Sequence, residues 1–179
     1  MGVTAILGGR FDPPHVGHLA LARAAVGQLE LDRLHVWVVA EAAHKPSEAP
    51  AAGRLTMARL TFGDLAAAVE LEEHPYTVDA LEARRPDDPV LLLGADALAD
   101  FPTWKRQERV LELARLAVAA RPGYPAATAS ERIDVFHLEP HDVSSSEIRS
   151  RVRRRESIDG LVVAPVASYI AEHRLYRAD

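Results

Sequence analysis

The sequence contains no cysteine, no asparagine and only two lysines, Lys45 and Lys105. Without cysteine the chain has no disulfide framework, no thiolate nucleophile and no thiolate metal site. It also lacks an apolar run long enough to span a membrane, and no basic segment with a cleavage site precedes the first apolar residues. We therefore expect a cytoplasmic protein that does not act at a membrane.

A surplus of positive charge is absent as well, because 26 acidic residues outnumber 21 basic ones and give a net charge of −5. Nucleic-acid-binding domains are usually strongly basic, so we expect no nucleic-acid partner. Hydrophobic residues make up 48% and charged residues 26%, an ordinary globular balance. The length of 179 residues predicts a single domain, residues 1–179, and leaves a homo-oligomer possible.

Apolar, β-branched runs alternate along the chain with runs of helical spacing. The candidate strands are residues 3–7, 34–40, 69–74, 90–94, 116–120 and 133–139. A continuously apolar strand such as "VLLL" is typical of a parallel sheet that is buried on both faces. The alternation predicts an α/β fold, a doubly wound, Rossmann-like parallel sheet with helices on both faces. We expect mobile surface loops at 41–53 and 121–130, and the second is also a candidate subdomain boundary.

In a doubly wound sheet, ligands bind beyond the carboxyl ends of the strands, where the strand order reverses. Residues capable of binding or chemistry follow each predicted strand in turn: Gly8 to His18, His44 and Lys45, Tyr76 and Thr77, Gly94 to Asp96, Arg121, and Ser144 to Arg149. Randomly scattered polar residues would not favour one end of the sheet so consistently. The sequence therefore predicts a ligand site at this end.

The segment "GGRFDPPHVGH", residues 8–18, lies where the first strand ends. Gly8 and Gly9 let the backbone turn sharply and let a ligand approach without meeting a Cβ atom. Asp12, followed by two prolines, predicts a helix start with a capping carboxylate and a first turn that proline favours. The unpaired N–H groups and partial positive charge of a helix start bind phosphate well.

His15 and His18 are three residues apart and are expected on one face of that first helical turn. Both imidazoles can then donate hydrogen bonds to one anion and, if protonated, add positive charge. Two alternatives remain at this point. The histidines can be packing or surface residues, or they can bind a metal, although no third ligand stands at helical spacing.

Taken whole, "GGRFDPPHVGH" (8–18) resembles the signature of the nucleotidylyltransferase superfamily, a Gly-rich turn followed by His-x-Gly-His. The second half of that signature, a Ser/Thr-rich turn before a helix, is similar to "VSSSEIRSRV" (143–152). "LLLGADALADFPTWKRQERVLELARLAVAARPGYP" (91–125) resembles the bacterial nicotinate-nucleotide adenylyltransferases. "YTVDAL" (76–81) and "VVAPVASYIAEHRLY" (162–176) are similar to that family too. The resemblance covers nearly the whole chain, with its motifs in order.

The resemblance implies transfer of AMP from ATP to nicotinate mononucleotide, with Mg²⁺ carried by the ATP phosphates and no metal site made by the protein. The catalytic residues that it implies are His15, His18, Lys45 and Arg149. The implied ATP-binding residues are Gly8, Gly9, Arg10, Phe11, Gly94, Asp96, Ser145 and Ser146. The implied acceptor-binding residues are Thr77, Trp104 and Arg121, with Trp104 packing on the nicotinate ring.

Each of these residues also has a purely structural interpretation. Trp104 can belong to the core, and Asp96 can cap a helix. Ser144 and Glu147 have the spacing of a capping box, which we favour for Glu147. The basic run 149–155 is expected to be a solvated helix face apart from Arg149.

The sequence departs from the family at Arg10, where relatives usually carry threonine or serine, and the arginine can reach the triphosphate or pyrophosphate or extend into solvent. Phosphopantetheine adenylyltransferase, or another member of the superfamily, is the alternative enzyme, although "FPTWK" and "ARPGYP" fit it poorly. A nucleotide-binding regulator without activity is a second, remoter alternative.

Overall fold

The computed structural model describes residues 3–43, 46–120 and 132–177. Six strands form one sheet in the order β3-β2-β1-β4-β5-β6, and all neighbouring strands are parallel. The strands are β1 (Thr4–Gly9), β2 (Arg33–Val39), β3 (Ala68–Glu72), β4 (Pro89–Leu93), β5 (Arg115–Ala120) and β6 (Ile133–His137). Each overlaps a strand predicted from the sequence, and the doubly wound α/β fold is confirmed.

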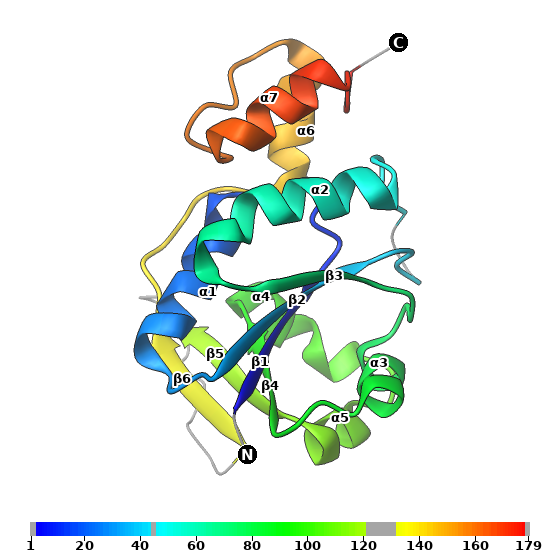
Figure 1. Ribbon diagram of the computed structural model, residues 1–179, viewed down its shortest axis with the longest axis vertical. Helices are drawn as coiled ribbons and strands as arrows, with labels where there is room; N and C mark the ends of the chain where they lie inside the picture. The colour runs from blue at the N-terminus through cyan, green and yellow to red at the C-terminus, as the bar shows by residue number, and fades with distance from the viewer. Residues whose placement is uncertain (1–2, 44–45, 121–131, 178–179) are drawn as a thin grey trace.

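Helices cover both faces of this sheet (Figure 1). They are α1 (Val16–Gln28), α2 (Ala51–Phe62), α3 (Thr77–Arg84), α4 (Ala95–Asp100), α5 (Gln107–Leu113), α6 (Ser145–Arg154) and α7 (Ala164–Glu172). Short 3₁₀ turns follow α2 (Gly63–Leu65) and α4 (Phe101–Thr103). Side chains of α1 and α2 pack on one face, and side chains of α3, α4 and α5 pack on the other.

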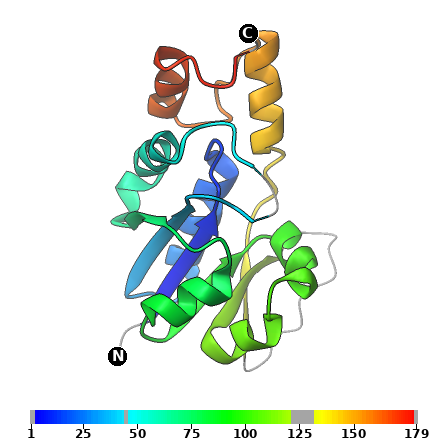
Figure 2. The same ribbon diagram turned by 90° about the vertical axis from the view of Figure 1, so that its right-hand side faces the viewer.

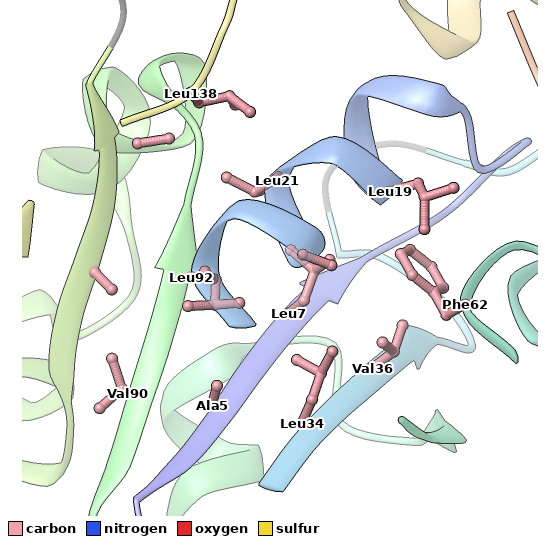
Figure 3. Close-up of a cluster of buried hydrophobic side chains, with 14 of the residues drawn as sticks. Ala5, Leu7, Leu19, Leu21, Leu34, Val36, Phe62, Val90, Leu92 and Leu138 are labelled. Carbon is pink, nitrogen blue, oxygen red and sulfur yellow. The ribbon is translucent and has the colours of Figure 1, made fainter. Parts of the chain in front are cut away.

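The sheet separates two apolar cores because successive side chains of a strand point to opposite faces. In β1, Ala5 and Leu7 join the core beneath α1, whereas Ile6 joins the core beneath α3 and α5. Figure 3 shows Leu19 and Leu21 of α1 over the face that carries Ala5 and Leu7. The continuously apolar β4 serves both cores at once, as a buried parallel strand must.

A third apolar cluster joins the two C-terminal helices to α2. It contains Met57 of α2, Ile148 of α6, Val166 and Ile170 of α7, and Tyr176 beyond α7. Both ribbon views place α6 and α7 past the end of the sheet at which β1 terminates (Figure 1, Figure 2). The C-terminal segment therefore packs beside the predicted ligand site, which the sequence alone did not indicate.

The strand order reverses at β1, since β2 and β3 extend to one side of it and β4, β5 and β6 to the other. The carboxyl ends of β1 and β4 flank this switch point, where doubly wound folds bind their ligands. The Gly-rich turn at the end of β1 therefore lies where the sequence analysis placed a site.

Two predictions about the starts of helices are wrong. Helix α1 begins at Val16, with His15 and not Asp12 at the N-cap position. Asp12 is buried, and its carboxylate binds backbone N–H groups of the segment before α2, so it cannot cap α1. The predicted loop 41–53 is also too long, because Ala51 already begins α2.

Candidate active site

The buried carboxylate of Asp12 joins three segments of the chain at the end of β1. It accepts hydrogen bonds from the backbone N–H groups of Glu48 at 2.7 Å and Ala49 at 3.1 Å. It also accepts one from the hydroxyl of Tyr176 at 2.8 Å. A buried carboxylate requires such donors, and together they fix the turn after β1, the segment before α2 and the C-terminal segment in one arrangement.

Arg54 of α2 makes a second set of contacts in the same region. Its side chain is only 1% exposed and donates to four backbone carbonyl oxygens at 2.6 to 3.0 Å. The acceptors are the carbonyl groups of Arg10, Val39, Ala40 and Ala49. Arg54 thus ties the ends of β1 and β2 to the segment before α2. Its burial was not expected from the sequence, because an arginine on a helix gives no sign that it is buried.

The rings of His15 and His18 stack, with centroids 3.7 Å apart and an interplanar angle of 26°. The backbone N–H of His15 donates to Nδ1 of His18 at 3.2 Å, and the ring of Phe11 meets His18 edge-on at 5.0 Å. Nδ1 of His15 is buried and has no hydrogen-bond partner within the described chain. The predicted pair therefore shares one face and carries unused hydrogen-bonding capacity.

Both imidazoles are neutral at pH 7 in this arrangement. Burial, with a smaller electrostatic effect of His141, lowers the pKa of His15 to about 4. Burial and the neighbouring His15 lower the pKa of His18 well below its ordinary value. The two rings can therefore offer a ligand hydrogen bonds and not a fixed positive charge.

Glycines allow the close packing around the two rings. A Cβ atom at Gly17 would lie 3.1 Å from the ring of His15 and 3.1 Å from Val143, and one at Gly9 would lie 3.1 Å from the ring of Phe11. A Cβ atom at Gly8 would meet nothing within 4 Å. The backbone at Gly8 therefore faces open space, as the sequence analysis expected for a ligand.

Helix α6 brings the second signature segment against the first. Oγ of Ser145 donates to the carbonyl of Pro13 at 2.8 Å, and Nη1 of Arg149 donates to the carbonyl of Asp12 at 2.8 Å. Nε of Arg149 binds Oε1 of Glu48 at 2.7 Å, and Ser146 receives a longer contact from Arg149 at 3.5 Å. Although 132 residues separate Pro13 from Ser145, the sequence-predicted groups meet.

The start of α6 follows its predicted cap in part. The side chain of Ser144 accepts a hydrogen bond from the backbone N–H of Glu147 at 3.2 Å. The side chain of Glu147 instead pairs with Arg151, so the reciprocal half of a capping box does not form. The remaining arginines of α6 are partly exposed and ion-paired, as a solvated face requires.

A cavity of about 180 Å³ opens beside the Gly-rich turn. Gly8, Gly9 and Arg10 line it together with Thr77 of α3 and Trp104. Its floor is apolar and belongs to β1 and β4. Thr77 and Trp104, two of the predicted acceptor-binding residues, thus lie beside the Gly-rich turn that precedes the histidines. The size and the aromatic wall of the cavity suit a small flat ring.

Trp104 is held in place by its neighbours. The ring of Phe101 lies 5.2 Å from that of Trp104, centroid to centroid. Lys105 pairs with Asp79 of α3 at 2.8 Å and lies 4.5 Å above the ring of Tyr76. These contacts fix the segment after α4 against the start of α3. Trp104 is therefore partly a core residue and partly a cavity wall.

The other predicted residues lie nearby or outside the described chain. Gly94 is the N-cap residue of α4, so the structural interpretation of Asp96 as that cap is wrong. Asp96 is exposed in the first turn of α4, directly after β4. Lys45 and Arg121 lie outside the described residues. The cavity wall also contains Trp37, Glu72 and His74, which the sequence analysis did not select.

No group of three or more histidine, aspartate or glutamate side chains is arranged to hold a metal ion in 3–43, 46–120 and 132–177. Over the same described residues, none of the helices combines the length and apolar character needed to traverse a bilayer.

Comparison with known proteins gives a consistent family. The model of the cytidylyltransferase-like family matches residues 6–151. A probable nicotinate-nucleotide adenylyltransferase of Bordetella petrii is 42% identical over 190 residues, covering 96% of this chain and 97% of that protein. One of Thermus thermophilus is 40% identical over 182 residues, covering 96% and 98%.

Solved structures show the same fold at low sequence identity. Nicotinic acid mononucleotide adenylyltransferase of Plasmodium falciparum complexed with NaAD has a TM-score of 0.79 and 16% identity, covering 98% of each chain. A putative nicotinate-nucleotide adenylyltransferase of Vibrio parahaemolyticus has a TM-score of 0.65 and 18% identity, covering 100% of this chain and 98% of that one.

Proposed function

The chain belongs to the cytidylyltransferase-like family, and we infer that it is a nicotinate-nucleotide adenylyltransferase. It transfers AMP from ATP to nicotinate mononucleotide and releases nicotinate adenine dinucleotide and pyrophosphate, a step of NAD biosynthesis. One structural observation supports this most. The stacked His15 and His18, the buried Arg149 and the cavity with Trp104 all adjoin one Gly-rich turn.

In the proposed reaction a 5′-phosphate oxygen of the acceptor attacks the α-phosphorus of ATP. A new P–O bond forms, the bond to the β-bridging oxygen breaks, and pyrophosphate leaves with that electron pair. The acceptor phosphate is already ionised near neutral pH, so no protein nucleophile is needed. The protein must hold two polyanions together and stabilise charge on the leaving group.

We place the ATP phosphates against His15, His18 and Arg149, where the backbone of Gly8 and Gly9 leaves room. His15 and His18 contribute hydrogen bonds, since burial keeps them neutral in the free protein. Arg149 contributes a guanidinium that Glu48 holds at 2.7 Å. Roles for Arg10, Phe11, Gly94, Asp96, Ser145, Ser146, Lys45 and Arg121 stay predictions.

We place the nicotinate ring of the acceptor in the cavity lined by Trp104 and Thr77. An aromatic face offers a flat platform to a pyridine ring, and the backbone N–H groups near these residues suit a carboxylate. We therefore expect the acid mononucleotide to be preferred over the amide. Arg10 lines the same cavity, and its predicted contact with ATP stays a prediction.

Enzymes that transfer nucleotides from ATP generally use a divalent metal, and we propose Mg²⁺ carried on the triphosphate. Magnesium keeps several waters and commonly binds substrate phosphates in place of a protein cage. When bound, it shares the charge of the leaving pyrophosphate. A cytoplasmic location, a single domain over 1–179 and any homo-oligomer stay predictions. The shared cluster of α2, α6 and α7 supports the single domain.

A pyrophosphate-release assay with ATP and three acceptors tests the function: nicotinate mononucleotide, nicotinamide mononucleotide and phosphopantetheine. We expect the fastest release with nicotinate mononucleotide. Fastest release with phosphopantetheine would assign the other enzyme of the superfamily. ATP binding without pyrophosphate release for every acceptor would indicate a regulator. Equal rates on the acid and the amide would contradict the expected preference.

A further inference from the structure

Two residues at the end of β3 share the wall of the Trp104 cavity, Glu72 and His74. Glu72 is 2% exposed. Its Oε1 accepts the backbone N–H of His74 at 2.8 Å and lies 2.6 Å from ring Nδ1 of the same residue. Backbone and ring of His74 are therefore both fixed by one buried carboxylate. The side chain of His74 is still 41% exposed, so a ligand can reach it.

The contact with Glu72 determines what the ring can offer on its other side. With Nδ1–H donating to Glu72, a neutral ring has a lone pair at Nε2, whereas an imidazolium has an N–H there. Nε2 of His74 has no hydrogen-bond partner among the residues that the structure describes. Among the described residues, Nε2 is thus an unpaired atom at the cavity, a hydrogen-bond acceptor in the neutral ring and a donor in the imidazolium.

Glu72 belongs to a network of charged side chains, so a proton on His74 changes the charge of that network. Nε of Arg84 contacts Glu72, and its Nη1 donates to Glu70 at 2.9 Å. Glu70 also pairs with Nδ1 of His35 at 2.9 Å. Burial would raise the pKa of Glu70, but hydrogen bonds from Arg84 and His35 hold it below its ordinary value. Two carboxylates thus share one guanidinium, and with neutral histidines the network is negative by one charge.

We propose that His74 is a specificity-determining residue that makes the choice between the acid and the amide mononucleotide depend on pH. The inference rests on the proposed function of the same cavity. A nicotinate carboxylate placed near Glu72 adds negative charge to a network that already has an excess, and an imidazolium at His74 offsets it. A nicotinamide group adds no charge and can donate its N–H to the neutral ring.

His35 meets the network only through Glu70, and neither of these two residues lines the cavity, so among the cavity-lining groups this effect falls to His74. Glu72 faces it from β3 and Arg84 stands behind Glu72 from α3, while Thr77 of α3 does not titrate. Arg10, from the turn after β1, keeps its charge and donates to the carbonyl of Pro46 at 2.9 Å. Binding of the acid mononucleotide therefore takes up a proton at His74.

The first test is the ratio of kcat/KM for nicotinate mononucleotide to that for nicotinamide mononucleotide, from pH 5.5 to 8.5. The two acceptors carry the same phosphate and use the same ATP, so their shared titrations cancel in the ratio. For the unmodified protein we expect the ratio to fall about tenfold as the pH rises through the range where histidine titrates. A flat ratio overturns the proposal.

The second test compares His74→Gln with His35→Gln, its matched control at the far end of the network. His74→Gln is expected to lower kcat/KM for the acid about tenfold at pH 6, to change the amide less than threefold, and to abolish the pH dependence of the ratio. His35→Gln is expected to keep both the ratio and its slope. Equal losses for both acceptors in His74→Gln would show a merely structural role and overturn the proposal.

If the enzyme does not use nicotinamide mononucleotide, the ratio of kcat/KM values cannot be measured, and calorimetry provides the test. Nicotinate mononucleotide is titrated at pH 7.5 into the protein in two buffers of different ionisation enthalpy, which gives the protons taken up on binding. We expect uptake for the unmodified protein and for His35→Gln, and less uptake for His74→Gln. The same uptake in all three overturns the proposal. Absence of pyrophosphate release with either acceptor would instead overturn the proposed function.

Discussion

The hydroxyl of Tyr176 donates a hydrogen bond to Oδ1 of Asp12 at 2.8 Å, and both side chains are buried. Burial, together with the Asp12 carboxylate, raises the pKa of Tyr176 above its ordinary value, so the phenol stays protonated and remains a donor. The bond attaches the C-terminal segment to the turn that follows β1. The last residues of the described chain thereby support the proposed catalytic turn.

Tyr176→Phe leaves that carboxylate oxygen short of a buried donor. We expect the free energy of unfolding in urea to fall by about 1–3 kcal/mol. Tyr169→Phe is the matched control, because the ring at position 169 stacks on His173 and the substitution keeps that ring. That variant is expected to stay within about 0.5 kcal/mol of the unmodified protein. Equal losses in the two variants would contradict the importance of the Asp12 contact.

Arg54→Met removes the donors of four backbone carbonyl groups at the ends of β1 and β2. It also removes one of the two buried guanidinium groups near Asp12, the other being that of Arg149. We expect a loss of about 3–5 kcal/mol in the free energy of unfolding, measured by urea denaturation. Arg59→Met, an exposed position on the same helix, is expected to change it by about 0.5 kcal/mol or less. A small effect at Arg54 would show that these carbonyl groups find other donors.

Arg149 and Arg153 both bind Glu48 at 2.7 Å, yet only Arg149 is buried and reaches the carbonyl of Asp12. Arg149→Ala is therefore expected to reduce turnover about 100-fold or more, through loss of a preorganised donor to the ATP phosphates. Arg153→Ala removes the same carboxylate contact from a half-exposed position, and turnover is expected to stay within a factor of about two. Similar losses of turnover in the two variants would show that the loss comes from the broken contact with Glu48 and not from a missing donor to the ATP phosphates.

His18→Ala removes one of the two imidazoles that we place against the ATP phosphates. Loss of one preorganised donor costs about 100-fold to 1000-fold in rate, and we expect turnover to fall by that amount. The measurement is steady-state pyrophosphate release with saturating ATP and nicotinate mononucleotide, after circular dichroism has shown that the variant is folded. Turnover within about threefold of the unmodified protein would remove His18 from the mechanism.

The buried histidines make stability depend on pH with a definite sign. The pKa of His15 is about 4 in the folded protein against an ordinary value of 6.5, so the unfolded chain binds more protons between these two values. The free energy of unfolding therefore falls as the pH drops from 6.5 toward 4, and His18 acts in the same direction. Urea denaturation at pH 7.5, 6, 5 and 4.5 measures this slope.

His15→Gln is expected to make that slope shallower while leaving a similar stability at pH 7.5. Above pH 6.5 both states hold the neutral ring, so the contribution of His15 no longer changes with pH. Identical slopes for the variant and the unmodified protein would show that His15 is not responsible.

Several features were readable from residue order because they depend on local chemistry. Apolar runs fix the six strands, and their continuity in β4 indicates burial on both faces. The Gly-rich turn, His15 and His18 follow β1 directly, so their proximity needs no knowledge of packing.

The predicted start of α1 at Asp12 is wrong because contacts with distant segments outweigh the local preference of Asp12 for an N-cap position. Asp12 has the sequence context of an N-cap, yet segments 36 and 164 residues away supply its donors. Burial of Arg54 is hidden for the same reason, since its four acceptors lie on three separate segments. Pattern rules see neighbours along the chain and cannot weigh such contacts.

By itself the sequence determined the strands, the Gly-rich turn after β1 and the set of candidate site residues, because each follows from spacing within a few residues. Only the tertiary structure decided that Asp12 and Arg54 are buried supports, that Arg149 is held by Glu48, and that His74 joins the wall of the Trp104 cavity. Hydrogen bonds and ion pairs join groups that folding brings together. The separation of those groups along the chain does not indicate how close they lie in the folded protein.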